Sequence, residues 1–188
     1  IEDEAIRNVV KMQESVGLQS ISDGEFRRRS YIIDFFQKAA GPDGITLENG
    51  IFFHKNAKGD RVYLEDLIVH KPMRWNGPIF ADHLAFLRGA TTRTPKITLP
   101  SPAIIHFLGG KKAILREAYT SVDQFWADLI EVYRSELAAL AQAGCTHVQF
   151  DETSIVKIGD PEIRKLLEGR GDDPNKLTEM YEIGRAHV

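Results

Sequence analysis

Residues 144–152 read Gly-Cys-Thr-His-Val-Gln-Phe-Asp-Glu and hold the most informative local pattern of the chain. The preceding residues 121–143 predict a long amphipathic helix. Residues 146–150 then predict a short strand, which ends at the acids Asp151 and Glu152. A helix that leads directly into a strand is typical of an α/β protein with a parallel sheet.

The same alternation extends toward both ends of the chain. Helices are predicted over residues 5–16, 27–40, 78–88, 121–143 and 161–167 and from residue 174 onward, and strands over 18–22, 67–70, 95–100 and 146–150. Ser121 and Gln124 have the spacing of a helix capping box. Two strand-forming runs flank a Gly-containing loop and predict an inserted β-hairpin near 51–64.

The composition excludes several classes of protein. The 188 residues carry 24 basic and 27 acidic side chains, a formal net charge of −3, which removes the main electrostatic reason to expect nucleic acid. No apolar run approaches the roughly 20 residues of a membrane span. The single cysteine, Cys145, excludes an internal disulfide and favours a reducing, cytoplasmic compartment. The chain begins at Ile1 without a signal-peptide pattern, and we expect it to start part-way through a longer product.

Polar side chains follow the predicted strands where each strand ends. Asp23 and Glu25 follow the first strand, Ser101 follows residues 95–100, and Asp151 follows the last strand. The carboxyl ends of parallel strands meet on one face, where ligands bind in barrels. Acids gathered there suit an ammonium group, a metal or a cationic intermediate. Each acid could equally be a turn residue or a helix cap, so the pattern alone leaves the function open.

Three motifs in order carry a resemblance to a known family. They are Ser22–Arg28 (Ser-Asp-Gly-Glu-Phe-Arg-Arg), Lys96–Pro102 (Lys-Ile-Thr-Leu-Pro-Ser-Pro) and His147–Glu152. The sequence resembles the cobalamin-independent methionine synthases over about residues 1–177, and most resembles the short, single-barrel bacterial members. The resemblance implies that residues 1–181 form a partial (β/α)8 TIM-type barrel that lacks its first strand and its C-terminal strands.

The resemblance also implies an activity. Members of the family transfer a methyl group to the thiol of homocysteine and use zinc at the barrel mouth, where the metal supplies a thiolate nucleophile. In the long enzymes the methyl donor is a methyltetrahydrofolate. The long enzymes carry a Trp where this chain has Leu108, which argues against a folate-type donor. The expected partners are small molecules, with no nucleic acid or membrane, and the oligomeric state is left open.

Five residues are predicted to bind substrate. By resemblance, Glu25 and Asp151 hold the amino-acid substrate, with Asp23 beside them, and Ser101 lies in the turn after the fourth strand, near the donor. Asp151 follows the fifth strand. Trp75, after the third strand, is a candidate for stacking on a ligand because loops at this face of a barrel carry the site.

No catalytic or metal-binding residue is predicted within the chain. The His-x-Cys motif and the later Glu and Cys of the zinc site are expected downstream, so the chain alone is expected to bind no catalytic zinc. Cys145 is expected to be a small buried side chain. The run Arg27–Arg29 is expected to form a solvated helix face rather than a phosphate site.

Two other functions remain open from the sequence. One is a uroporphyrinogen-decarboxylase-like or corrinoid-linked methyltransferase barrel. The other is a non-catalytic substrate-binding barrel that keeps the carboxylates without metal chemistry.

The last seven residues, Glu182–Val188, have an unusual reading. Written as GAG ATC GGA AGA GCA CAC GTC, they match from the second base the start of a common short-read sequencing adapter, whose next three bases form a stop codon. We therefore expect residues 182–188 to be adapter translation rather than native sequence, and His187 is not counted as a zinc ligand. The alternative is an ordinary helix end.

Overall fold

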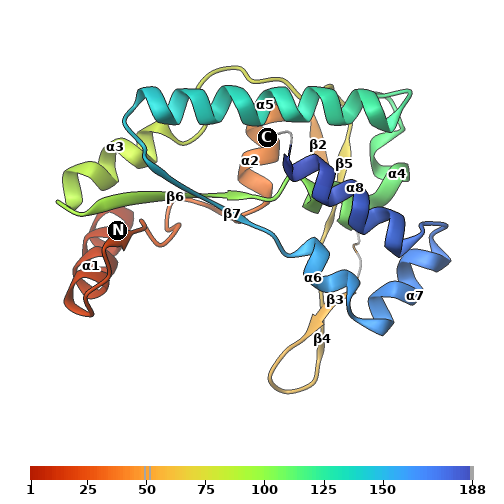
Figure 1. Cartoon of the computed structure of the whole chain (residues 1–188), viewed down its shortest axis with the longest axis horizontal. Helices are drawn as coiled ribbons and strands as arrows, with labels where there is room; N and C mark the ends of the chain where they lie inside the picture. The colour runs from red at the N-terminus through yellow and green to blue at the C-terminus, as the bar shows by residue number, and fades with distance from the viewer. Residues whose placement is uncertain (49, 51, 187–188) are drawn as a thin grey trace.

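The computed structural model of the chain describes residues 1–48, 50 and 52–186 (Figure 1). The helices are α1 (Glu2–Ser15), α2 (Ile33–Ala40), α3 (Ala81–Ala90), α4 (Ala103–Ile114), α5 (Val122–Gln142), α6 (Ser154–Ile158), α7 (Pro161–Gly169) and α8 (Pro174–Ala186). The strands are β1 (Ser20–Ile21), β2 (Ile45–Glu48), β3 (Phe52–Lys55), β4 (Arg61–Tyr63), β5 (Asp66–Val69), β6 (Thr94–Pro100) and β7 (His147–Asp151).

A parallel sheet of order β1-β6-β7 organises the fold. Ser20 pairs with Thr94, and β6 pairs with β7 from Lys96–His147 to Pro100–Asp151. Helix α1 packs on β1 and α3, while α5 runs alongside β6 and β7 (Figure 1). This confirms the predicted α/β class with parallel strands, and the partial (β/α)8 barrel stays a prediction.

The predicted numbering of the barrel strands is wrong by one from the third strand onward. Strands β1, β6 and β7 are direct neighbours, so no third barrel strand lies between β1 and β6. The residues expected to supply one, 67–70, instead form most of β5, which pairs antiparallel with β2. The segment from β1 to α3 therefore lies outside the parallel sheet, which it leaves at the carboxyl end of β1.

The segment between β1 and α3 includes a projecting hairpin. Strands β3 and β4 pair antiparallel and point away from the body of the molecule (Figure 1). The hairpin predicted near 51–64 is thus confirmed over its described residues, while Ile51 lies outside them. Strand β2 was not predicted.

Helix α5 forms where the pattern predicts. The Ser121 hydroxyl accepts the Gln124 N–H at 3.2 Å, as a capping residue should. Phe125, Leu129 and Tyr133 are fully buried along its stripe. Between residues 27 and 40, however, only Ile33–Ala40 is helical. None of the described helices is long and apolar enough to cross a lipid bilayer.

Helix α4 was not predicted, although it lies at the centre of the core. Nine of its twelve residues are buried and the exposed Lys111 and Lys112 lie in its last turn, so residues 103–108 are buried on every side and give no amphipathic period to read. Arg170 donates to the carbonyl oxygens of Phe107 and Leu108, both at 2.9 Å, where Gly110 breaks the helical backbone. A helix that is apolar all round is recognised only once its neighbours are in place.

Candidate functional site

A strained turn after β1 presents Glu25. Gly24 and Glu25 both have left-handed backbone, with φ of 66° and 60°. A Cβ at Gly24 would lie 2.9 Å from the Phe26 ring, so the position requires glycine. The left-handed conformation costs a non-glycine residue about 1–2 kcal/mol. Strain of this kind at a carboxylate is a reason to look for function there.

Neighbouring groups hold the Glu25 carboxylate in place. The Thr98 hydroxyl, from β6, donates to Glu25 Oε1 at 2.5 Å. The Arg28 guanidinium lies 3.9 Å from the same oxygen. The carboxylate therefore rests against the middle strand of the sheet.

Asp151 and Glu152 lie at the carboxyl end of β7. Asp151 Oδ1 accepts from the Gln149 amide at 2.6 Å. Glu152 accepts the Ser101 hydroxyl with one oxygen and the N–H groups of Ser154 and Ile155 with the other, at 2.6 and 3.1 Å. Glu152 thus holds the start of α6, whereas Asp151 Oδ2 accepts no hydrogen bond from the residues that the structure describes.

Glu25 and Asp151 line the same cavity, which has a volume of about 420 Å³. Its walls are Glu25, Tyr31, Phe150, Asp151, Glu152 and Thr153. The expectation that the two carboxylates face a common cavity at one rim is confirmed. Of the described residues that form these walls, none is basic, so the cavity suits a cation flanked by aromatic rings.

Tyr31 was missed by the sequence analysis. Burial raises the pKa of its phenol, and the charges of Asp151, Glu25 and Glu152 raise it further, while Thr153 works in the opposite direction. The phenol therefore stays protonated among acids and can donate a hydrogen bond. An aromatic residue shortly after the Gly-Glu turn was the available signal.

Asp23 does not line this cavity. Its side chain is buried, with Oδ1 on the Glu25 N–H at 2.9 Å and Oδ2 3.6 Å from His83 Nδ1. Burial alone would raise the pKa of Asp23, but His83, the Glu25 N–H and the Arg28 charge together lower it. Asp23 supports the turn that carries Glu25.

Ser101 and Trp75 also lie outside the cavity walls. Ser101 is fully buried, and its hydroxyl is bonded to Glu152. The Trp75 indole donates to Glu136 of α5 at 3.0 Å. The Ser101 N–H donates to the Asp151 carbonyl oxygen at 3.2 Å, so Ser101 lies beside the cavity without lining it. Trp75 is not brought to Glu25 and Asp151.

The prediction that Arg27–Arg29 form a solvated helix face is wrong. These residues lie in non-helical turns. Arg27 pairs with Asp3 at 2.5 Å, and the Arg28 side chain is only 2% exposed. The acceptors and the aromatic ring around the buried Arg28 come from distant segments of the chain. Counting local charges does not reveal them.

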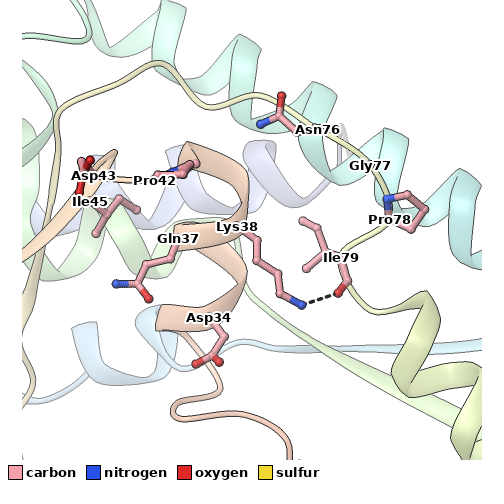
Figure 2. Close-up of a pocket in the computed structure, with 11 residues that line it drawn as sticks. Asp34, Gln37, Lys38, Pro42, Asp43, Ile45, Asn76, Gly77, Pro78 and Ile79 are labelled. Carbon is pink, nitrogen blue, oxygen red and sulfur yellow. Dashed lines mark hydrogen bonds between the residues drawn. The ribbon is translucent and has the colours of Figure 1, made fainter.

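A second cavity of about 820 Å³ lies between α2, residues 41–45 and residues 76–79 (Figure 2). Lys38 reaches across it and donates to the Ile79 carbonyl oxygen at 2.8 Å. None of the predicted site residues lines this cavity. The described residues that line this cavity do not point to a particular ligand or reaction.

Comparison with known proteins places the chain in a family. The family model described as cobalamin-independent synthase, catalytic domain, matches residues 2–169. The chain belongs to this family. The predicted resemblance to cobalamin-independent methionine synthases is confirmed, and the uroporphyrinogen-decarboxylase-like alternative is not favoured.

Relatives of this family resemble the chain over almost its whole length. The uncharacterized proteins YxjH and YxjG of Bacillus subtilis are 29% and 30% identical over 96% of the chain, which spans 46% and 47% of their lengths. The methionine synthase of Sulfolobus acidocaldarius is 24% identical over 81% of the chain. The chain therefore spans about half the length of these relatives.

Solved structures agree with the fold. A structure from Listeria monocytogenes, assigned as a vitamin-B12-independent methionine synthase, superposes with a TM-score of 0.71 at 26% identity and covers 99% of the chain and 49% of its own. A B12-independent methionine synthase from Shewanella sp. W3-18-1, in complex with selenomethionine, gives 0.62 at 23% identity. The match covers 82% of this chain and 42% of that one, and at this identity it supports the fold alone.

The described residues do not fit the zinc ion that cobalamin-independent synthases use. No three His, Cys, Asp or Glu side chains converge as ligands anywhere in 1–48, 50 and 52–186. The Cys145 thiol is buried and contacts the His147 carbonyl oxygen at 3.4 Å, at the amino end of β7. Leu108 is buried inside α4.

Proposed function

We propose that this chain supplies the amino-acid-binding part of an S-methyltransferase that methylates the thiol of homocysteine. The observation that carries the proposal is the shared cavity of Glu25 and Asp151 in a chain that belongs to the cobalamin-independent synthase family. The selenomethionine complex of the Shewanella protein is consistent with an amino-acid ligand in this family.

The two carboxylates bind and orient the substrate. Glu25 and Asp151 accept hydrogen bonds from the α-ammonium group, and charge-assisted bonds of this kind fix its direction. Tyr31 and Phe150 form apolar walls beside the cation. With the ammonium group fixed, the thiol has a defined position for attack on the methyl group.

A zinc ion, when bound, would hold the thiol as a thiolate. Because the described residues offer no ligand cluster, such ligands would have to come from elsewhere. Methyltetrahydrofolate is the first methyl donor to test.

Calorimetric titration of the chain with L-methionine and L-homocysteine tests the proposal. Glu25→Gln should weaken binding by about 1.5–3 kcal/mol, the scale of one charge-assisted hydrogen bond. Glu162→Gln is the matched control, since Glu162 pairs with Lys55 on the hairpin instead. An unchanged affinity in Glu25→Gln, or no binding by the wild-type chain, would contradict the proposal. Selective binding without any methyl transfer by the longer protein would favour the non-catalytic alternative.

A further inference from the structure

Arg28 is a buried cation directly behind Glu25. Its guanidinium lies 4.0 Å from the centre of the Phe80 ring, and Nη1 donates to the Thr98 carbonyl oxygen at 2.9 Å. Nε and Nη2 have no hydrogen-bond partner among the residues that the structure describes. Burying a charge that is only partly paired costs several kcal/mol, so packing alone does not account for an arginine here.

Arg28 contacts Glu25 through both its backbone and its side chain. Its N–H donates to the Glu25 carbonyl oxygen at 2.9 Å and closes the strained turn. Its guanidinium and the Thr98 hydroxyl both face Glu25 Oε1, at 3.9 and 2.5 Å. Among the described residues, no protein group donates a hydrogen bond to Glu25 Oε2, which leaves this oxygen for a ligand.

We propose that Arg28 is a positioning residue: with Thr98, it fixes the Glu25 carboxylate in the orientation that receives the α-ammonium group of an amino-acid ligand. This inference rests on the proposed function. Arg28 does not line the cavity, so it acts through Glu25 rather than on the ligand itself. The loss caused by removing Arg28 should therefore be confined to ligands that carry the ammonium group.

Two ligands and three variants test the inference by calorimetry. L-methionine is compared with 4-(methylthio)butanoate, which lacks the α-ammonium group. Arg28→Met should weaken L-methionine binding about tenfold or more, the effect of disturbing one charge-assisted hydrogen bond, and leave the desamino compound unchanged. Arg28→Lys, which keeps the charge, should recover part of the loss. Arg27→Met is the matched control in the same turn and should bind both ligands as the wild type does.

Each outcome has a distinct meaning. Equal losses for both ligands, or no loss for either, would overturn the role of Arg28 while L-methionine binding by the wild-type chain still supports the proposed function. A wild-type chain that does not bind L-methionine would overturn the proposed function and this inference together. Circular dichroism establishes that each variant is folded. If Arg28→Met does not fold, Arg28→Gln, which lacks the charge but keeps a donor, takes its place with the same two ligands.

Discussion

At the scale of single residues, His106 shows how burial alone can set a protonation state. It is fully buried in α4, and its Nδ1 is 2.8 Å from the Tyr181 hydroxyl. Burial is the main cause that lowers the pKa of His106 to about 4; the charges of Arg170 and Lys111 act in the same direction, and Asp172 opposes them. The imidazole is therefore neutral in the folded chain near neutral pH.

This burial predicts a pH-dependent stability. Between the ordinary pKa of 6.5 and the folded value of about 4, the unfolded chain binds a proton that the folded chain does not. The free energy of unfolding should fall as pH drops through this window, by up to about 3 kcal/mol at about 1.4 kcal/mol per pH unit. Urea unfolding at pH 7, 6 and 5 measures it. His106→Gln should flatten the slope, whereas the exposed control His147→Gln should keep it.

The residues of the site were only partly predictable. Glu25 and Asp151 were singled out by the family resemblance and by their positions, because acids at the carboxyl ends of parallel strands share one face. Asp23, Ser101 and Trp75 were placed near them for the same reason, but their directions depend on His83, Glu152 and Glu136, which come from distant elements. Sequence spacing predicts where such a residue lies along a strand or loop, but it does not predict which partner orients the side chain.

At the scale of elements, α5 depends on a buried acid as well as on its apolar stripe. Glu136 is fully buried and accepts the N–H groups of Ile79 and Phe80, at 2.8 and 3.0 Å, and the Trp75 indole N–H. One carboxylate therefore fastens α5 to the segment that enters α3.

Removing the Glu136 carboxylate should weaken the contact between α5 and the segment that enters α3. Glu136→Ala leaves three buried donors without an acceptor, and we expect it to lower the free energy of unfolding by about 2–4 kcal/mol. Chemical denaturation measures the change. Glu131→Ala, at an exposed position of the same helix, should stay within about 0.5 kcal/mol of the wild type. Equal effects of the two substitutions would show that Glu136 is not the anchor.

Elements with a clear period were predicted, and elements without one were not. Helix α5 follows from its 3.6-residue pattern, and the β3–β4 hairpin follows from two strand-forming runs on either side of a Gly-containing loop. Residues 103–108 of α4 are all buried, and β2 is only four residues long, so neither shows a clear alternation of apolar and polar residues in the sequence. The placement of β5 outside the parallel sheet depends on its pairing with β2, which no local rule specifies.

At the scale of the whole molecule, the absence of a ligand cluster in the described chain leads to a prediction about zinc. The purified 188-residue chain should bind no stoichiometric zinc and should not convert homocysteine to methionine with methyltetrahydrofolate. Atomic absorption after dialysis and a product assay measure the two. Tight zinc at one equivalent together with turnover would contradict the prediction.

The end of the chain can be tested at the level of DNA. We propose that Glu182–Val188 are translated from a sequencing adapter, and sequencing the source locus across this point should reveal different codons after Tyr181. Tyr181 itself packs in the core against His106 and Trp126. Coding sequence that continues through Ile183–Val188 would refute the proposal and restore His187 as a candidate ligand.

The position of Glu25 against β6 also has a consequence for folding kinetics. Glu25 and Thr98 are 73 residues apart in the chain, and Ser101 and Glu152 are 51 apart, so the site forms only after both parallel pairings have closed. Contacts of such long range are made late in folding. Ligand affinity should therefore appear after most of the helical signal during refolding, and a bound amino acid should slow unfolding without accelerating the return to the native state.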